Sequence, residues 1–484
     1  MIRVRSSLIS LPVARRLSVA SDSIVDALKE RIPTVKCSTN PYELALHAKG
    51  ESFVQWPHAD VLVSPTNLQD LQAIVRYCNE SRTPIVPYGA GSSMEGNLAA
   101  PYGGVCVDLQ YFNSIEIHAD DALAIVGAGV SRKTLNRELR HTGLQFVVDP
   151  GADATIGGMV STCASGTAAV KYGTMKENTL ALECVLADGS VMKCGTKALK
   201  NSAGYNLLEL MVGSEGTLGI ITNATVKLHP IPEVVVAAIC TFDSLYDAAQ
   251  AVATLRLRQV PVSRCELLDE TSVEAFNAYT KESEPMELKP TLFLEFEGPN
   301  DAIVGEQVLL AQSICIEDFS GSNFDFCSKE DDRRALWAAR HNLYYASLAL
   351  RPGSTGALVT DACVPLSAFA SMMDCTSKDV RESGIVGPCF GHAGDGNFHS
   401  VIPLKDDDTE DYRRRVDEVN DRLVQRTLQV GGTCTGEHGI GSVKIKYLPK
   451  QYGEAAVNVM RLIKRSLDPY NILNPGKVIS YEQS

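Results

Sequence analysis

Three glycine-rich tracts, each next to a short apolar segment, constrain the fold more than any other feature of this sequence. They run Tyr88–Asn97, Asp149–Gly166 and Gly213–Thr222. Glycine lets a backbone approach a ligand closely, and its unhindered N–H groups can turn toward an anion. Any one tract alone would fit an ordinary turn, where glycine and serine are also common. All three together, beside predicted buried strands, favour a ligand site.

The first tract ends a predicted strand–helix–strand pattern. Residues 61–63 and 84–87 read as short buried strands, and apolar residues recur at helical spacing over 68–81. The tract offers backbone N–H groups to a pyrophosphate but has no Walker lysine. Neither this tract nor Gly127–Gly129 has the Gly-x-Gly-x-x-Gly spacing, which argues against a nicotinamide site of the Rossmann type.

The second tract predicts a helix that begins at Ile156, with Thr155 or Asp153 as its N-cap. Its Gly157–Gly158 pair would let a ligand or another backbone segment come close. The third tract leads from a loop into a predicted strand.

The length of 484 residues predicts more than one domain, because a single core rarely grows beyond about 250–300 residues. Pro230 and Pro232 mark the expected boundary. Beyond them the sequence changes to longer amphipathic stretches and strands such as Thr291–Glu297.

The first twenty residues have the composition of a mitochondrial presequence. Arg3, Arg5, Arg15 and Arg16 alternate with serine and aliphatic residues, and no acidic residue precedes Asp22. A terminus that is basic by chance, on a cytosolic protein, is the alternative. The chain does not end in the peroxisomal signal Ser-Lys-Leu.

The overall composition narrows the classes of partner. A net charge of −13 argues against nucleic acid, whose phosphates require a basic surface. No apolar run approaches the roughly 18 residues that cross a bilayer, so no transmembrane segment is expected. The fourteen cysteines include no Cys-x-x-Cys pair, and we interpret them as free thiols in a reducing compartment.

Two glycine-framed loops near the C-terminus predict a metal site with a base beside it. Gly391–His399 and Gly436–Gly441 together contain three of the nine histidines and Glu437. Imidazole nitrogens and carboxylate oxygens are common ligands of divalent transition metals. Histidine and glutamate on loops are more often plain surface residues, so this interpretation depends on the tracts upstream.

With these motifs taken together, the chain resembles the vanillyl-alcohol oxidase or PCMH-type flavoproteins, and within them the D-2-hydroxy-acid dehydrogenases. The resemblance runs from about Ala59 to Val478. It implies an α+β fold with a PCMH-type two-part FAD-binding domain over residues 21–230 and an α+β cap domain with an antiparallel sheet over 231–430. A C-terminal helical segment, 431–484, would return to the FAD domain and complete the active site. FAD would be bound non-covalently, since the first tract has no histidine to attach it.

The resemblance also implies which residues hold FAD. The first tract would bind the pyrophosphate, the second would line the flavin, and part of the third would approach the adenosine side. The expected FAD-binding residues are Tyr88, Gly89, Ala90, Gly91, Ser92, Ser93, Asn97, Pro150, Asp153, Thr155, Gly157, Gly158, Ser161, Ser165, Gly166, Glu215, Gly219, Ile220 and Asn474.

By the same resemblance, His392, His399 and Glu437 would bind a divalent metal and His438 would be the catalytic base. Zinc, manganese and iron all suit two nitrogens and one oxygen. A metal chelated by a 2-hydroxy acid would lower the pKa of the hydroxyl group. A neutral imidazole could then take the hydroxyl proton near physiological pH.

Arg340 matches the family's carboxylate-binding arginine, a task that suits the guanidinium fork, although a surface role is the alternative. Trp337 and Asn397 are further expected substrate contacts. Ala393 stands where relatives often have valine, which could widen the pocket slightly.

The substrate expected from these residues is a short D-2-hydroxy acid. A dicarboxylate such as 2-hydroxyglutarate needs a second cation, because burying an unpaired charge is costly. Trp337, Asn342 and Val359 near the expected pocket offer none, with Arg351 left open. D-lactate is therefore favoured, and glycolate and D-2-hydroxyglutarate are the alternatives.

The electron acceptor must be external, since the sequence has no haem motif of the Cys-x-x-Cys-His type and no nicotinamide site. Cytochrome c or a quinone carrier is expected from the resemblance. Two rival hypotheses are a transferase resembling alkylglycerone phosphate synthase and a non-enzymatic flavin-binding module. Glu437 and His438 speak against both.

Overall fold

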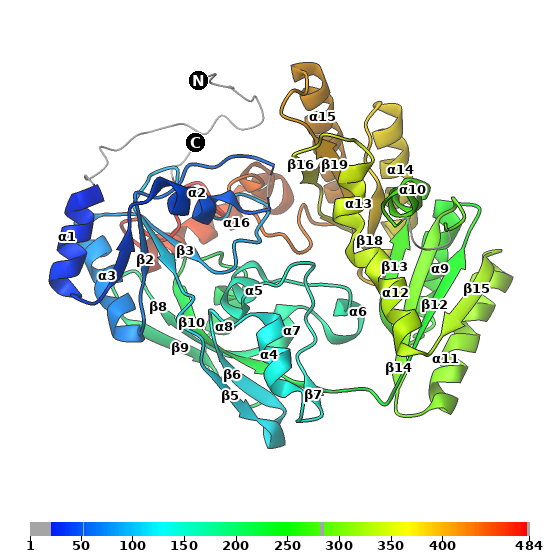
Figure 1. Cartoon of the computed structure of the whole chain (residues 1–484), viewed down its shortest axis with the longest axis horizontal. Helices are drawn as coiled ribbons and strands as arrows, with labels where there is room; N and C mark the ends of the chain where they lie inside the picture. Colours follow the sequence, from blue (N-terminus) through cyan, green and yellow to red (C-terminus); the bar gives the residue numbers. More distant parts are fainter. Residues whose placement is uncertain (1–20, 52, 281–284, 482–484) are drawn as a thin grey trace. The chain divides into compact units, whose positions relative to one another are not determined.

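The structure is a computed structural model that describes residues 21–51, 53–280 and 285–481 (Figure 1). The expected presequence, residues 1–20, lies outside the described residues. The chain forms two compact units. The terminal unit contains residues 21–165, Thr174–Ile231 and residues 437–481, and the central unit contains Gly166–Gly173 and Pro232–Gly436.

The terminal unit is built on two sheets. The four-stranded sheet has the order β1 (Lys36–Ser38), β2 (Val61–Ser64), β4 (Val105–Asp108), β3 (Ile85–Tyr88), in which β2, β4 and β3 are parallel and β1 is antiparallel. The five-stranded sheet is antiparallel, with the order β5 (Ile115–His118), β6 (Leu123–Gly127), β10 (Ile220–Lys227), β8 (Thr179–Val185), β9 (Val191–Gly195). A short pair joins β7 (Leu144–Gln145) to β11 (His229–Pro230).

Helices connect these strands. They are α1 (Ser21–Arg31), α2 (Pro41–Lys49), α3 (Leu68–Ser81), η1 (Ala119–Asp121), α4 (Arg132–Leu139), α5 (Ile156–Thr162), α7 (Met175–Asn178), α8 (Leu207–Met211), η4 (Ile445–Tyr447) and α16 (Leu448–Leu467). The helix predicted over 68–81 is confirmed as α3, which buries Leu71, Ile74 and Val75 in the core. Its first turn is capped by the Asn67 side chain, which accepts a hydrogen bond from the Asp70 N–H.

The central unit contains one eight-stranded antiparallel sheet. Its order is β15 (Ser322–Cys327), β12 (Val234–Thr241), β14 (Thr291–Gly298), β13 (Val262–Leu268), β18 (Cys389–His392), β19 (Asn397–Leu404), β16 (Gly356–Val359), with β17 (Ala362–Cys363) also paired to β19. Its helices are α6 (Ala169–Tyr172), α9 (Leu245–Leu257), α10 (Glu270–Tyr279), α11 (Asp301–Ser313), η2 (Ile314–Asp318), α12 (Glu330–His341), α13 (Leu343–Ala349), α14 (Leu366–Glu382), η3 (Ala393–Asp395) and α15 (Glu410–Gln429).

Both faces of this sheet are covered, and β14 shows how. Leu292, Leu294 and Phe296 pack into a core with residues of α9, α11 and α14. Phe293 belongs to a separate core with residues of α10, α12 and α13. Because side chains alternate between the faces of a strand, the two sides of β14 contact different cores. The second face is where the polar side chains described below are buried.

None of the helices in the described part of the chain is long and apolar enough to span a membrane.

Candidate active site

A buried carboxylate on β13 joins a predicted metal ligand to the predicted substrate-binding arginine. Glu266 is fully buried, with one oxygen 2.6 Å from Nδ1 of His392 and the other accepting a hydrogen bond from Nε of Arg340, also at 2.6 Å. Glu266 and His392 are direct partners across the β13–β18 ladder, whereas Arg340 comes from α12. The sheet register and one helix thus bring together three residues that are far apart in sequence.

The second predicted histidine ligand comes from the neighbouring strand. His399 lies on β19, and its ring is 5.7 Å from that of His392 between centroids, with the two planes nearly perpendicular. One potential ligand nitrogen from each ring lies within 4.8 Å of the other. Nδ1 of His399 is 2.9 Å from the Thr360 carbonyl oxygen. Because a protein oxygen holds Nδ1 of both rings, a metal would be bound through Nε2 of each.

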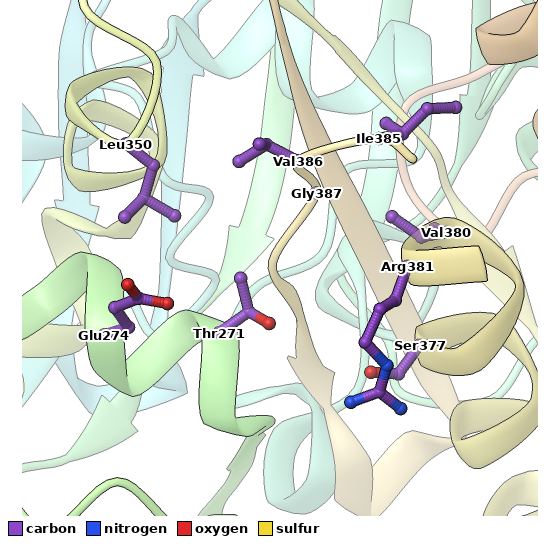
Figure 2. Close-up of a pocket in the computed structure, with 9 residues that line it drawn as sticks. All are labelled: Thr271, Glu274, Leu350, Ser377, Val380, Arg381, Ile385, Val386 and Gly387. Carbon is purple, nitrogen blue, oxygen red and sulfur yellow. The ribbon is translucent and has the colours of Figure 1, made fainter. Parts of the chain in front are cut away.

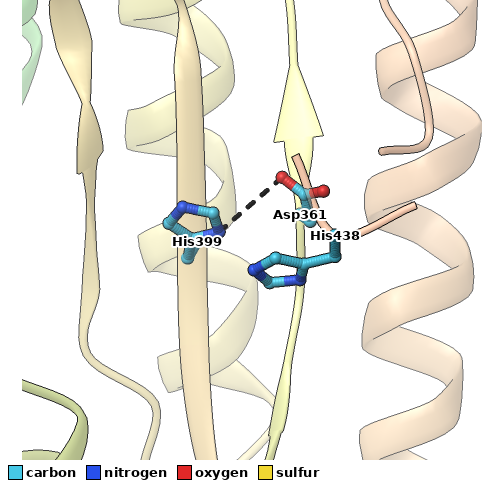
Figure 3. A group of neighbouring side chains, drawn as sticks. All are labelled: Asp361, His399 and His438. Atoms are coloured by element: carbon cyan, nitrogen blue, oxygen red, sulfur yellow. Dashed lines mark ion pairs between the residues drawn. The ribbon is translucent and has the colours of Figure 1, made fainter. Parts of the chain in front are cut away.

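The Asp361 carboxylate faces His399 (Figure 3) and also accepts hydrogen bonds from three other groups. This buried carboxylate lies 3.8 Å from Nδ1 of His399 and accepts hydrogen bonds from the Asn397 side-chain amide at 2.8 Å and the Thr435 hydroxyl at 2.7 Å. The same carboxylate accepts the Gly436 N–H at 2.8 Å. Gly436 directly precedes Glu437 and His438 in the chain.

Two buried groups beside these residues have a polar atom without a hydrogen-bond partner among the described residues. One is Oδ1 of Asn397. The other is Arg340, whose terminal guanidinium nitrogens make no hydrogen bond to a described residue, although the group lies 4.7 Å from the Phe390 ring centroid. Buried polar groups are normally satisfied, so these donors and this acceptor suit a bound ligand.

Trp337 and Arg264 lie on the same face of the central sheet. Trp337 is buried and packs against Phe293, with ring centroids 6.3 Å apart. The Arg264 guanidinium carbon is 5.5 Å from the Trp337 ring centroid, and Nη1 of Arg264 is 2.5 Å from the Glu295 carboxylate. The positive charge of Arg264 is therefore already offset. Arg351, left open from the sequence, is likewise bound to the Asp408 carboxylate.

In the terminal unit, the first glycine-rich tract, which the sequence predicts to bind a pyrophosphate, is a loop that follows β3. The backbone N–H groups of residues 89–94 form no hydrogen bond to another described residue. A side chain at Gly89 would collide with the Thr155 hydroxyl, whose oxygen would be 2.4 Å from the new Cβ. A glycine there therefore lets the first and second tracts meet.

The second tract begins its helix where the sequence predicts, but the capping differs. α5 starts at Ile156 with Thr155 at the N-cap position, yet the Thr155 side chain makes no capping bond and its hydroxyl has no partner among the described residues. Asp153 is not an N-cap of α5, because its carboxylate accepts hydrogen bonds from the Lys133 N–H and the Ser131 hydroxyl at the start of α4. The buried hydroxyls of Thr155 and Ser214 are thus left to bind a ligand.

Glu215, expected near the adenosine side of FAD, binds the second C-terminal loop. Its buried carboxylate accepts the Ile440 N–H at 2.6 Å, the Gly441 N–H at 2.8 Å and the Asn97 side-chain amide at 2.5 Å. Burial raises the pKa of Glu215 to about 7, despite these donors. Asn474 donates its amide to the Glu215 carbonyl at 2.7 Å, so the C-terminal return is fixed to the third tract.

His438 has a buried carboxylate beside it within the terminal unit. Nδ1 of His438 is 3.3 Å from Glu95, and the Lys444 ammonium is 2.8 Å from the same oxygen. Burial opposes ionisation of Glu95, but the charges of Lys444 and His438 outweigh it and hold the pKa of Glu95 below its ordinary value.

The other predicted cofactor residues lie in the same three tracts. Tyr88 ends β3 and packs on His47, with ring centroids 4.3 Å apart. The Ser161 hydroxyl bonds back to the Gly157 carbonyl within α5, and Ile220 begins β10. The remaining members of the second and third tracts, Pro150, Gly158, Ser165 and Gly219, lie within or next to these elements or at turns. Gly166 is the residue at which the chain passes into the central unit.

Sequence reasoning missed three acidic residues: Glu266, Asp361 and Glu95. Glu266 had a visible signal, because it is a charged residue inside the otherwise largely apolar strand Val262–Leu268. A charge at such a position is buried unless the strand is on a surface, and buried charges need partners. Asp361 is a charged residue two positions after the strand Gly356–Val359, and it too is buried.

The donor sets fit the two expected cofactors. Unpartnered backbone N–H groups and buried hydroxyls suit the phosphates and ring edges of FAD. Two imidazoles anchored through Nδ1 suit a divalent transition metal, and Glu437 is a third donor of the right chemistry.

A hollow elsewhere in the central unit includes none of these residues (Figure 2). It has a volume of about 200 Å³ and is lined by residues of α10 and α14 and the segment before β18. Glu274 and Arg381 are its charged side chains, and both are exposed. The Ser377 hydroxyl at its wall is already bonded to Asp269.

Two family models match the chain. The "FAD binding domain" model matches residues 59–195, and the "FAD linked oxidases, C-terminal domain" model matches residues 231–478. These matches confirm the predicted fold class, with a PCMH-type FAD-binding domain followed by an α+β domain.

Three curated relatives cover most of the chain. A probable mitochondrial D-lactate dehydrogenase of Danio rerio is 44% identical over 90% of this chain and 88% of its own length. A mitochondrial D-lactate dehydrogenase (cytochrome) of Arabidopsis thaliana is 41% identical over 87% and 73%. The glycolate oxidase subunit GlcD of Bacillus subtilis is 32% identical over 87% and 89%. The resemblance to D-2-hydroxy-acid dehydrogenases is thus confirmed.

Solved structures share the fold at low identity. p-Cresol methylhydroxylase with bound substrate superposes with a TM-score of 0.74 at 18% identity, covering 96% of this chain and 98% of that one. Alkyldihydroxyacetonephosphate synthase superposes with a TM-score of 0.72 at 19% identity, covering 96% and 87%. At this identity the likeness concerns the fold alone.

Proposed function

Because this chain belongs to the family of FAD-linked oxidases, we propose that it is an FAD-dependent D-lactate dehydrogenase that uses a divalent metal. The observation that carries this proposal is the pair of contacts made by Glu266. They place an arginine with unsatisfied terminal nitrogens beside a histidine suited to bind metal. A 2-hydroxy acid would offer its carboxylate to Arg340 and its hydroxyl to a metal held by His392.

Arg340 would bind the substrate carboxylate through its terminal nitrogens, while Nε stays on Glu266. This contact fixes one end of the substrate. Asn397, with its unpartnered buried Oδ1, would accept a hydrogen bond from the substrate or from a water on the metal.

His392, His399 and Glu437 would hold the metal, which supplies a Lewis acid that lowers the pKa of the substrate hydroxyl. Support for Glu437 as the third ligand comes from the chain itself, since it follows Gly436, which Asp361 anchors next to His399. His438 would remove the hydroxyl proton, and the Glu95 carboxylate lies 3.3 Å from its Nδ1. FAD, when bound by the three tracts, supplies the acceptor for the hydride from Cα.

A monocarboxylate suits this site better than a dicarboxylate. The two arginines that could bind a distal carboxylate, Arg264 and Arg351, are neutralised by Glu295 and Asp408. The aromatic ring of Trp337 would limit the substrate side chain. Glycolate is the second candidate, because one relative is a glycolate oxidase subunit.

The relatives' names support a mitochondrial location and a cytochrome-type electron acceptor. The relatives from zebrafish, Arabidopsis and yeast are named mitochondrial, and those from Arabidopsis and yeast carry the word cytochrome. We therefore place the protein in mitochondria, with residues 1–20 as the presequence, and cytochrome c or a quinone carrier as its electron acceptor.

The decisive test is anaerobic stopped-flow absorbance of the purified FAD-loaded protein. It would be mixed separately with D-lactate, L-lactate, glycolate and D-2-hydroxyglutarate, before and after chelator treatment. We expect rapid flavin bleaching by D-lactate, lost after chelation and restored by added metal. Bleaching by another acid would change the substrate assignment. No bleaching by any of the acids would overturn the dehydrogenase assignment.

A further inference from the structure

We propose that Glu266 is a positioning residue that sets the tautomer of one metal ligand and the orientation of the substrate-binding arginine at the same time. The inference rests on the proposed function, and it adds a residue that touches neither substrate nor flavin.

Both carboxylate oxygens of Glu266 are used by its contacts with His392 and Arg340. Both of its oxygens are within 2.6 Å of a nitrogen, one on His392 and one on Arg340, and the side chain is fully buried. Those contacts come from two separate elements, β18 and α12. A buried ionised carboxylate needs a compensating charge, which Arg340 provides.

The tautomer of His392 follows from this contact. An ionised carboxylate can only accept hydrogen bonds, so Nδ1 of His392 must carry the hydrogen. The lone pair then lies on Nε2, where a metal can bind. A carboxylate in this position also raises the basicity of a metal-bound imidazole and fixes the ring orientation.

The same carboxylate orients Arg340. With Nε on Glu266, the guanidinium plane is held along that edge, and neither terminal nitrogen makes a hydrogen bond to a described residue. The Phe390 ring, 4.7 Å from the guanidinium carbon, covers one face. Glu266 therefore links the metal-binding His392 to the anion-binding Arg340 through a single side chain.

Replacing Glu266 with glutamine tests the predicted tautomer of His392, because glutamine has nearly the same volume but presents an NH₂ donor in place of one carboxylate oxygen. Arginine has no acceptor, so the amide oxygen of the substituted side chain must face Arg340 and its NH₂ group must face His392. Nδ1 of His392 would then have to accept, which moves the ring hydrogen to Nε2 and blocks metal binding there. Glu266→Gln should thus shift the tautomer while keeping the side-chain volume.

The test measures metal affinity directly, by competition of Zn²⁺ between the FAD-loaded protein and a chromophoric chelator. For Glu266→Gln we expect a loss of affinity of about 10- to 100-fold, the usual effect of removing such a partner. FAD content should stay at the wild-type level. Glu266→Asp, which keeps an acceptor-only group, should recover part of the affinity.

Glu297→Gln is the matched control. Glu297 is also buried in the central sheet and also shared by a cation and a neutral donor, here Lys171 at 2.7 Å and the Tyr172 hydroxyl. It touches no predicted ligand, so its replacement should cost folding stability but leave Zn²⁺ affinity unchanged.

A second readout is the KM for D-lactate, which should rise in Glu266→Gln even at saturating metal, because a neutral amide oxygen holds the Arg340 guanidinium less strongly than a carboxylate does. Wild-type Zn²⁺ affinity and KM in a folded, FAD-loaded Glu266→Gln protein would overturn the proposal. Absence of Zn²⁺ binding or of D-lactate turnover in the wild type would instead overturn the proposed function, so the two failures are distinguishable.

Discussion

Asp361 accepts a hydrogen bond from the backbone N–H of Gly436 at 2.8 Å, although the two residues are 75 positions apart in the sequence. The contact fixes the start of the segment that carries Glu437 and His438. The Thr435 hydroxyl and the Asn397 amide reach the same carboxylate, so one buried side chain holds three separate donors.

Replacing Asp361 with alanine should therefore loosen this segment. We expect a loss of stability of about 1–3 kcal/mol, from buried donors left without an acceptor, and at least a tenfold fall in the rate of flavin reduction by D-lactate. Chemical denaturation and stopped-flow absorbance measure the two effects. Asp379→Ala is a useful comparison, since Asp379 binds Arg422 and Arg426 between α14 and α15 and should affect stability only. Equal effects of both variants on the rate would contradict the assigned role of Asp361.

Replacing Arg340 with lysine should raise the KM for D-lactate by about 10- to 100-fold. A lysine ammonium cannot bind Glu266 through one edge and a carboxylate through another, as a planar guanidinium can. Steady-state kinetics with an artificial acceptor measures the change. Arg351→Lys, which alters the contacts of Arg351 with Asp408, the Pro403 carbonyl and the Tyr412 ring, should keep the wild-type KM. An unchanged KM in Arg340→Lys would remove this residue from the substrate site.

The Thr155 hydroxyl is predicted to bind FAD, because it is buried and unused by the described part of the protein. Thr155→Val should weaken FAD binding several-fold while changing the stability of the FAD-free protein little. Fluorescence titration of the apoprotein with FAD gives the affinity. Thr222→Val should instead lower the stability of the FAD-free protein and leave FAD affinity unchanged. The Thr222 hydroxyl already donates to Glu183, at 3.1 Å to its carbonyl and 3.0 Å to its carboxylate. Full FAD affinity in Thr155→Val would show that this hydroxyl does not touch the cofactor.

The raised pKa of Glu215 predicts a pH dependence of stability. The folded pKa is about 7 and the ordinary value is 4.5, so between these pH values the folded state binds more protons than the unfolded state. The contribution of Glu215 to stability is therefore complete below about pH 4.5 and declines as pH rises to about 7. Above pH 7 it stays constant.

Denaturant unfolding of the wild type and Glu215→Gln at pH 5 and pH 8 tests this dependence. The difference in unfolding free energy between the two proteins should favour the wild type more at pH 5, by on the order of 2–3 kcal/mol. A difference that does not vary with pH would mean that Glu215 is ionised across this range in the folded protein.

Local patterns in the sequence were sufficient to predict several helices and strands. Helical spacing identified α3, and alternating apolar residues identified the strand at Thr291–Glu297, because these structures depend on which faces are buried. The start of α5 at Ile156 was also predicted, although the predicted capping bond from the Thr155 side chain is absent.

The partners of the site residues could not be read in the same way. Glu266 meets His392 only because β13 and β18 are adjacent in the sheet with that register, and it meets Arg340 only because α12 packs on that face. Strand order depends on the burial of whole faces, and no short stretch of sequence records it. Asp361 and Glu95 were missed for the same reason.

The sequence by itself determined the kinds of chemical group available: glycine-rich tracts for an anionic cofactor, and histidines and a glutamate in glycine-framed loops for a metal. These follow from residue type and spacing, which the chain carries locally. Only the tertiary structure decided how the groups are held: Glu266 shared between His392 and Arg340, and Asp361 on Gly436. A buried carboxylate is stable only where folding brings donors to it from distant segments, and that convergence is a property of the packed structure.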